Sequence, residues 1–324
     1  MINMMKKIFL YLIDGVRKKK INRNIKNILS TEKISFIDIG AAGNIHPRWK
    51  KISRNLNYYG FEPDLRSYEL LVDKKNECNE YKIFNTAIWE NESEIEINLC
   101  KKPWVSSFYK PNYDFLNNFP ESDRFTIIKN EKIKTNSLDN IKLRDKDFIK
   151  IDIQGGELNV IKGAPKTLQE CLGLEVEVEF LEIYKSQPLF GELCIFLKKQ
   201  GFEFIDFISL NRWERTKYDG YGQSTFGDAL FMRTPEYIQE IFSKEPNKLR
   251  KYIATCALYN RFDYIETTIN SKKIKEKFTF DELKIIKNST NQMKYRHKKI
   301  RLFNKFFNKI LRIIDDDNRL HLFY

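Results

Sequence analysis

The sequence predicts an α/β fold whose largely parallel sheet is covered by helices on both faces. Short apolar runs that stop at turn residues, such as Ile34 to Ile39 before Gly40, are typical of buried strands. Helix-forming segments follow several of these runs, as from Glu157 to about Glu170. Strands that alternate with helices favour parallel pairing, because each crossover helix returns the chain to the same edge of the sheet.

Further strands and helices are expected along the same body. The other strands are predicted at 57–62, 81–88, 92–99, 147–153 and 173–180, and further helices at 64–71 and 189–200. Segments 202–210 and 229–233 are expected to close the sheet as an antiparallel pair. Beyond Pro235 the pattern is helical only. We therefore divide the chain into a basic lead-in (1–33), a sheet-based domain (34–234) and a helical basic extension (235–324).

The net charge of +13 lies at the two ends of the chain. Residues 1–33 contain nine Lys and Arg against two acids, and residues 272–312 contain fourteen against three. The body between them, residues 34–271, is slightly acidic, which is unfavourable for tracking a phosphate backbone. No specific nucleic-acid partner is therefore expected.

The cysteines and the apolar runs narrow the class of protein further. The five cysteines are widely spaced and form no C-x-x-C pair, which argues against a disulfide framework and a structural zinc site and favours reduced thiols in the cytoplasm. No group of residues has metal-ligand spacing, so the sequence predicts no metal site. No apolar run approaches the roughly 18 residues that span a bilayer.

A strand that ends in a tight glycine turn is expected to approach a nucleotide-type cofactor. After Asp38, the turn contains Gly40, Ala41 and Gly43 and is followed by Asn44, so its small residues let the backbone come close to a ligand. The pattern is G-x-x-G, without the G-x-G-x-x-G that cradles a pyrophosphate. An acid at position 38 suits a cofactor with sulfonium and ammonium charges, which indicates S-adenosylmethionine.

A carboxylate at the end of the next strand is expected to bind the ribose hydroxyls of that cofactor. Glu62 lies 22 residues after Gly40 at such a strand end, which is the spacing this role requires. Asp64, Asn85 and Ala87 are expected beside the adenine. For Asn85, a turn at a strand end is an equally good interpretation.

Three segments carry a resemblance to a known family: FIDIGAAGN from Phe36, YGFEPD from Tyr59 and FIKIDIQGGELNVIKGA from Phe148. Across residues 34–233 the chain resembles the FkbM family of S-adenosylmethionine-dependent methyltransferases. The resemblance implies a class I methyltransferase fold, with a mostly parallel seven-stranded sheet and a reversed last strand. It also implies methyl transfer, usually to oxygen, on sugars or secondary metabolites. The chain departs from the family at Gln154, where members often carry Glu.

Asp152 is the best candidate for a catalytic residue near the transferred methyl group. It ends the strand expected beside the first one, and crevices in such sheets open at the carboxyl ends of strands. Its alternative role is to cap the following turn. Glu157 is better explained as an acid favoured at a helix start. His46, three residues after the glycine turn, is a weaker candidate base, because an exposed loop histidine is the commoner case.

The loop-rich segment 101–124 carries four residues that are candidates for binding the acceptor. Trp104, Ser106, Ser107 and Tyr109 are suited to a lid over the acceptor, since aromatic rings stack on sugar faces. Packing of a surface loop explains the same residues equally well.

Residues 294–314 alternate Lys and Arg with apolar residues near helical spacing. Such a helix is suited to peripheral contact with an anionic membrane surface. It is equally suited to packing on the body or on a partner with its charged face in solvent. The sequence leaves both interpretations open.

Three functions are compatible with the sequence, two of them enzymatic and one not. The first is methyl transfer to a hydroxyl of a sugar, a glycan or a related small acceptor. The second is an RNA methyltransferase that uses the basic ends as arms, which the acidic body disfavours. The third is a catalytically inactive binding protein that keeps the fold, against which the intact Asp38, Glu62 and Asp152 argue.

Overall fold

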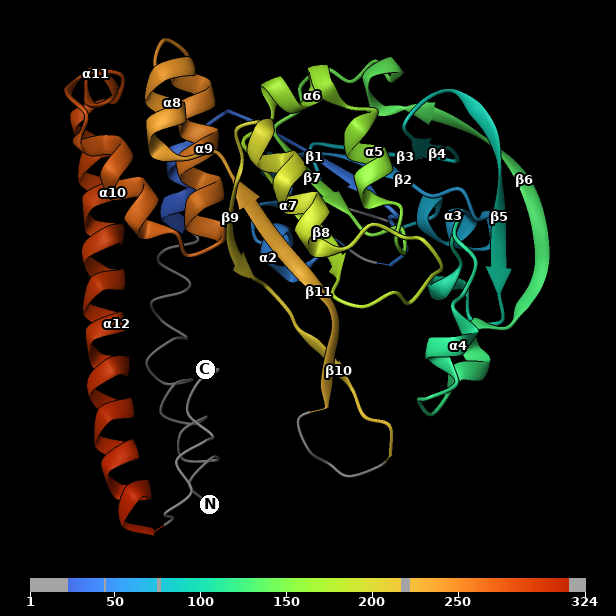
Figure 1. The fold of residues 1–324 in the computed structure, drawn as a ribbon. Coiled ribbons are helices and arrows are strands. Elements are labelled where there is room, and N and C mark those ends of the chain that lie inside the picture. Colours follow the sequence, from blue (N-terminus) through green and yellow to red (C-terminus); the bar gives the residue numbers. More distant parts are fainter. Residues whose placement is uncertain (1–22, 44, 75–76, 217–221, 315–324) are drawn as a thin grey trace. The chain divides into compact units, whose positions relative to one another are not determined.

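The computed structural model describes residues 23–314, apart from residues 44, 75–76 and 217–221 (Figure 1). The described chain divides into two compact units. One contains residues 31–241, and the other combines residues 23–30 with 242–314. The domain boundaries expected at residues 33 and 234 stay predictions.

The first unit is built on a large sheet in the order β10-β11-β8-β7-β1-β2-β3, with β9 also paired to β11. Its strands are β1 (Ile34–Ile39), β2 (Leu56–Phe61), β3 (Glu80–Phe84), β7 (Phe148–Ile151), β8 (Gly173–Glu179), β9 (Glu203–Phe207), β10 (Asn211–Trp213) and β11 (Gln223–Met232). Strands β3, β2, β1, β7 and β8 are mutually parallel, and β11 runs antiparallel to β8. The expected α/β class and the reversed last strand are confirmed. The large sheet has eight strands instead of seven, because the short strand β10 pairs antiparallel with the start of β11.

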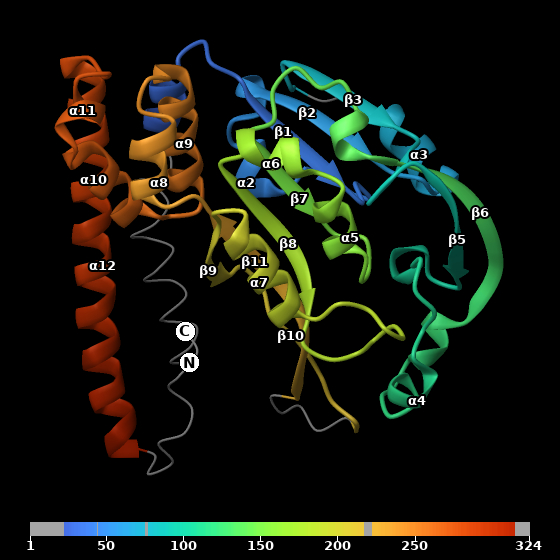
Figure 2. The ribbon, with the colours of Figure 1, turned by 45° about the horizontal axis from the view of Figure 1, so that its top comes forward.

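Helices cover the sheet, as expected for parallel strands joined by crossovers. They are α2 (Pro47–Lys50), α3 (Leu65–Val72), α5 (Glu157–Lys162), α6 (Pro165–Glu170) and α7 (Phe190–Lys199), and α8 (Pro235–Ile241) follows the last strand. Helices α5, α6 and α7 lie along one face of the sheet (Figure 2). The single helix expected from Glu157 to Glu170 is two, because Pro165 starts a new helix after Gly163.

The two faces of the central strands differ in chemistry. On β7, Ile149 and Ile151 point into the apolar core with α5–α7, whereas Lys150 points to the opposite face with its neighbour Asp38 on β1. Side chains alternate between faces along a strand, so one strand supplies both the core and a buried polar layer. The next residue in that row, Glu175 on β8, pairs with Lys150 in register and accepts a hydrogen bond from Arg48 at 2.8 Å.

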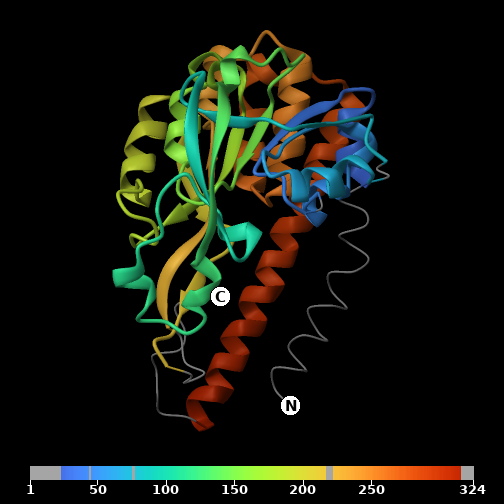
Figure 3. The same ribbon diagram turned by 90° about the vertical axis from the view of Figure 1, so that its right-hand side faces the viewer.

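A second, three-stranded sheet belongs to the same unit. It contains β4 (Ala87–Trp89), β5 (Ser93–Cys100) and β6 (Ile127–Ser137), in the order β4-β6-β5. Strands β5 and β6, teal and green in Figure 3, form a long antiparallel ribbon. The segment between them contains the short helix α4 (Tyr113–Leu116).

The second unit is helical. Its helices are α9 (Pro246–Leu258), α10 (Phe262–Asn270), α11 (Lys272–Lys275) and α12 (Phe280–Ile314), and residues 23–29 are helical too. The amide of Asn24 donates to Ser289 at 2.8 Å, and Arg250 pairs with Glu282 at 2.6 Å. Segment 294–314 lies within α12, but most of its side chains fall outside the described residues, so its membrane contact stays a prediction. None of the described helices has the length and apolar content needed to cross a membrane.

Candidate active site

A cavity of about 550 Å³ lies at the carboxyl ends of the central parallel strands. This is the position at which open α/β sheets bind ligands, and the volume is within the range of small-molecule sites. The ends of β1, β2, β7 and β8 line it on one side, and segment 103–108 with parts of β5, β10 and β11 line it on the other. The cavity is therefore enclosed by both sheets of the first unit.

The glycine turn after β1 brings backbone to the cavity. Gly40 has φ of +79°, and a Cβ added there would lie 1.9 Å from the carbonyl oxygen of Asp152, so only glycine fits. The N–H groups of Gly40 and Ala41 both donate to the carbonyl of Phe61. Gly40 lines the cavity, whereas Ala41 and Gly43 do not. Asn44 lies outside the described residues.

Asp38 lies beneath the cavity and is not part of its lining. It is 6% exposed, its Oδ2 accepts a hydrogen bond from the Tyr58 hydroxyl at 2.7 Å, and its Oδ1 lies 3.8 Å from Nζ of Lys150. Burial raises the pKa of Asp38, although the charge of Lys150 opposes the shift. Oδ1 is buried without a hydrogen-bond partner.

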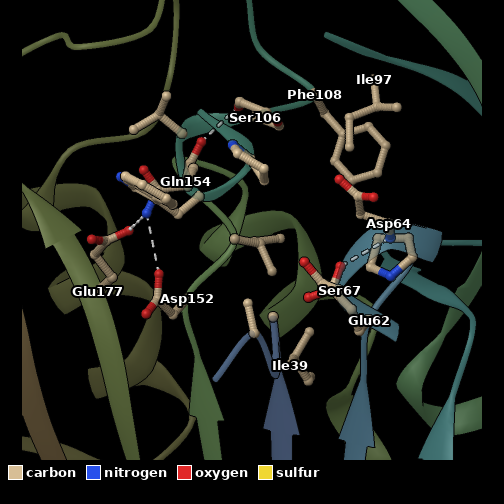
Figure 4. A pocket seen from close by; sticks show the side chains of 18 of the residues that line it. Ile39, Glu62, Asp64, Ser67, Ile97, Ser106, Phe108, Asp152, Gln154 and Glu177 are labelled. Carbon is tan, nitrogen blue, oxygen red and sulfur yellow. Dashed lines mark hydrogen bonds between the residues drawn. The ribbon is translucent and has the colours of Figure 1, made fainter. Parts of the chain in front are cut away.

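Glu62 follows β2 and lines the cavity with Asp64 (Figure 4). The N–H of Asp64 donates to Oε1 of Glu62 at 2.9 Å, a bond that leaves Oε2 unused. Burial raises the pKa of Glu62 to about 7, and the nearby carboxylates of Asp64 and Asp38 add to the shift. Asp64 also caps α3 by accepting the N–H of Arg66 at 2.9 Å. The turn thus presents one oxygen of a buried carboxylate to a ligand.

The residues after β3 support this turn. Asn85 does not line the cavity; its amide donates to the carbonyl oxygens of Glu62 at 3.0 Å and of Pro63 at 3.1 Å. Ala87 does line it, together with Thr86. Asn85 therefore fixes the backbone that carries Glu62.

On the other side of Ile39, Asp152 lies beside the glycine turn because its N–H donates to the Ile39 carbonyl at 2.9 Å. Its carboxylate accepts hydrogen bonds from Nζ of Lys150 at 3.1 Å and from the Gln154 amide at 3.2 Å. Burial alone would raise the pKa of Asp152, but the charge and hydrogen bond of Lys150 hold it below its ordinary value. Asp152 is therefore an ionised hydrogen-bond acceptor and a weak base.

Gln154 connects Asp152 to Glu177 on β8. Its amide nitrogen also donates to Oε2 of Glu177 at 2.6 Å (Figure 4). Its Oε1 accepts the Tyr184 hydroxyl at 3.1 Å. Its backbone is left-handed, with φ of +63°, and Ser107 donates to its carbonyl oxygen at 2.6 Å. Because a non-glycine residue is unfavourable in this region, the surrounding hydrogen bonds hold it there.

Segment 103–108 contributes three of the four residues expected over the acceptor. Trp104, Ser106 and Ser107 line the cavity, and Trp104 is 63% exposed. Tyr109 does not line it; its hydroxyl donates to Asn159 at 2.9 Å. Tyr109 faces away from the cavity because the chain turns at Ser107, whose side chain accepts a hydrogen bond from the Tyr109 N–H.

The sequence did not indicate the remaining wall of the cavity. An arginine, an amide and several aromatic and acidic side chains complete it: Arg124, Phe125, Glu177, Glu179, Asn211, Trp213 and Phe226. The Arg124 guanidinium lies 4.9 Å from the Trp213 ring centre, and its Nε is buried without a hydrogen-bond partner.

His46, the weaker candidate base, lies outside the cavity lining. It caps α2, where its Nδ1 accepts the N–H of Arg48 at 3.2 Å. Burial and the charge of Arg48 lower the pKa of His46. The arrangement gives this histidine a capping role.

A glycine turn after β1, an acid after β2 and a cavity over the carboxyl ends of the strands define the class I methyltransferase arrangement. Residues 38–204, about half of the chain, match the family model described as the methyltransferase FkbM domain. This chain belongs to the FkbM methyltransferase family.

Individual relatives are more distant. The 2-O-methyltransferase NoeI of Sinorhizobium fredii is 24% identical over 190 residues, which cover 54% of this chain and 76% of NoeI. The crystal structure of methyltransferase FkbM from Methylobacillus flagellatus is 16% identical, with a TM-score of 0.36 over 62% of this chain and 43% of that one. The 23S rRNA methyltransferase ErmE is 11% identical, with a TM-score of 0.34 over 75% and 82% of the two chains.

Proposed function

We propose that this chain transfers the methyl group of S-adenosylmethionine to a hydroxyl oxygen of a small acceptor, most directly a sugar or glycan. One observation carries the proposal: a single cavity has Gly40 and Glu62 on one side and Asp152, Gln154 and aromatic rings on the other. The family membership supports methyl transfer, and the name of NoeI as a 2-O-methyltransferase supports oxygen as the acceptor atom.

The residues on the first side fit the cofactor. Gly40 lines the cavity, and its lack of a Cβ lets the turn pack directly against the Asp152 carbonyl. Glu62 has an oxygen that its hydrogen bond from Asp64 does not use, as a pair of ribose hydroxyls requires. The buried Oδ1 of Asp38 contributes negative charge beneath the turn, which favours a cofactor with positive groups.

S-adenosylmethionine, when bound, supplies an electrophilic methyl group on its sulfonium sulfur. The contribution of the chain is to align the acceptor hydroxyl with that group and to exclude water. Asp152 accepts a hydrogen bond from the hydroxyl and orients it, because Lys150 and Gln154 fix the carboxylate. Its lowered pKa makes it an orienting group, not a strong base.

The charge of the cavity disfavours RNA as the acceptor. Among the described residues that line the cavity, five are acidic (Glu62, Asp64, Asp152, Glu177 and Glu179) and Arg124 is the one basic residue. Despite burial, the pKa values of Asp64 and Asp152 are lowered, mainly by Arg66 and Lys150 respectively, so these two carboxylates are ionised and repel a phosphate backbone. A neutral polyhydroxylated acceptor has hydrogen-bond donors for these carboxylates and apolar faces for the Trp213 ring.

The test is a transfer assay with S-adenosylmethionine that carries a labelled methyl group, against panels of free sugars, glycans, lipids, peptides and RNA. We expect label in a product of the sugar or glycan panel, in an ether linkage that resists alkaline hydrolysis. Label found only in RNA would contradict a sugar or glycan as the acceptor. If calorimetry detects no binding of S-adenosylmethionine, the proposed cofactor is wrong.

A further inference from the structure

Three buried glutamates meet beside Asp152 and Gln154 at the edge of the cavity. Glu157 is the first residue of α5, and Glu177 and Glu179 lie on β8. One carboxylate oxygen from each lies within 4.8 Å of those of the other two. Their side chains are 2%, 7% and 3% exposed, respectively.

Hydrogen bonds hold two of these glutamates in place. Oε1 of Glu157 accepts the N–H groups of Ile153 at 2.9 Å and Gly155 at 3.2 Å, and neither bond involves Oε2. Oε2 of Glu177 accepts the amide of Gln154 at 2.6 Å, and the Glu177 carboxyl also shares a hydrogen bond with the Asp152 carboxylate. A cation that binds Glu177 therefore replaces the proton of that carboxyl–carboxylate bond.

Glu179 differs from both, because its carboxylate accepts no hydrogen bond from any other described residue. It is nevertheless almost fully buried, it lines the cavity, and it points into the group formed by the other two. A buried carboxylate whose only donor is its own backbone N–H, and which has no cation, is unfavourable in the charged form. The nearby cations Lys150 and Arg48 pair with other carboxylates, those of Asp152 and Glu175.

We propose that Glu157, Glu177 and Glu179 bind one hard divalent cation, of the Mg²⁺ or Mn²⁺ class, at the edge of the cavity. Carboxylate oxygens are the ligands that these ions prefer. Opposite oxygens of one hard cation lie about 4 Å apart for Mg²⁺ and up to about 5 Å apart for a larger ion such as Ca²⁺. The 4.8 Å limit within which the three oxygens lie matches this spacing.

The position of the site gives the cation a role in the reaction, and this role rests on the proposed function whereas the binding site does not. Glu177 and Glu179 line the cavity, so the cation faces the acceptor half. A divalent cation lowers the pKa of a hydroxyl that it contacts, which supplies the activation that the weak base Asp152 does not. The hydroxyl proton passes to water, and the O–CH₃ bond forms as the S–CH₃ bond breaks with its electron pair left on sulfur.

The first test measures Mn²⁺ binding by electron paramagnetic resonance of the full-length protein after treatment with a chelator. We expect one Mn²⁺ per chain with a Kd of ~10⁻⁴ M or tighter, and binding at least ten-fold weaker in Glu179→Gln. The matched control is Glu175→Gln, which changes a buried glutamate of the same strand that is already paired with Arg48 and should retain binding. No bound Mn²⁺, or equal binding by wild type and Glu179→Gln, would overturn the site.

The second test does not depend on a variant. Mn²⁺ or Mg²⁺ should raise the thermal unfolding midpoint of the wild-type protein by several degrees at concentrations where K⁺ has no effect, and equal midpoints would overturn the proposal. Calorimetry with S-adenosylmethionine on the chelator-treated protein separates the two claims. Cofactor binding without Mn²⁺ binding defeats the cation site alone, whereas Mn²⁺ binding without cofactor binding defeats the proposed function alone.

Discussion

The half of the cavity around Glu62 is made mainly by backbone turns, whereas the half around Glu177 is made mainly by side chains. In the first half, N–H groups of Gly40 and Ala41 bind the Phe61 carbonyl and fix the shape of the turn. In the second half, the amide of Gln154 holds two carboxylates, and rings from β10 and β11 complete the wall. Backbone turns can form a site for a ligand that is the same in all proteins of one fold. A site for a ligand that differs among those proteins depends on side chains, which can change without changing the fold.

The largest expected effect is on the backbone half. Gly40→Ala places a Cβ 1.9 Å from the Asp152 carbonyl oxygen, in a left-handed conformation, and should lower the free energy of unfolding by about 3–5 kcal/mol. Equilibrium unfolding in urea measures this change in the free energy of unfolding. Gly191→Ala is the control, since no atom lies within 4 Å of the added Cβ. A loss below about 1 kcal/mol for Gly40→Ala would show that the turn is not fixed as described.

Glu62→Ala should weaken binding of S-adenosylmethionine by about 100-fold, because it removes a charged acceptor of two hydroxyl hydrogen bonds. Isothermal titration calorimetry at pH 8 gives the comparison. Glu69→Ala changes an exposed acid on α3 and should bind as the wild type does. Equal affinities for all three proteins would remove Glu62 from the site.

Gln154→Ala probes the side-chain half. It removes the shared donor of Asp152 and Glu177, so we expect kcat/KM for the acceptor to fall about 30-fold while the affinity for S-adenosylmethionine changes less than about three-fold. Steady-state kinetics and calorimetry measure the two quantities. An equal loss in both would mean that the two halves do not act separately.

The affinity for S-adenosylmethionine should depend on pH through Glu62. Burial raises the pKa of this carboxyl to about 7, so it is ionised above that pH and protonated below it. Only the ionised carboxylate can accept hydrogen bonds from both ribose hydroxyls. The affinity for S-adenosylmethionine should therefore fall about ten-fold from pH 8 to pH 6. The same titration with Glu62→Gln should be flat, and a wild-type profile that is flat too would contradict this assignment.

The smallest expected effect is at the exposed rim. Trp104 is 63% exposed, so Trp104→Ala should change the free energy of unfolding by less than about 0.5 kcal/mol relative to the wild type. We expect the same variant to raise the KM for the acceptor about two- to four-fold. An unchanged KM would assign this ring to the loop surface instead of the acceptor.

The sequence was sufficient to predict the sheet and the position of Gly40 and Glu62 at its carboxyl edge, because apolar runs, glycine turns and strand-end acids are local signals. It was insufficient for β6, whose residues 127–137 are mostly polar because this strand lies in the smaller, half-exposed sheet. It also did not reveal Glu177 and Glu179 as cavity residues. The alternation of acids at 175, 177 and 179 within a buried strand was the available signal, since residues two apart share one face.

The half of the cavity proposed for the acceptor depends on long-range contacts that no local pattern contains. Arg124, Trp213 and Phe226 come from three separate segments and meet only in the folded chain. Tyr109, two residues from a lining serine, faces Asn159 instead. Turn geometry and not spacing decides which side of the loop faces the cavity.

The most direct test is a crystal structure of the full-length protein with S-adenosylhomocysteine, the demethylated product. We predict that the ribose hydroxyls bind Glu62, that the amino-acid end lies at the Gly40 turn, and that the sulfur faces Asp152. A nucleoside bound instead against Glu177 and Trp213, with Glu62 free of contacts, would contradict the division of the cavity.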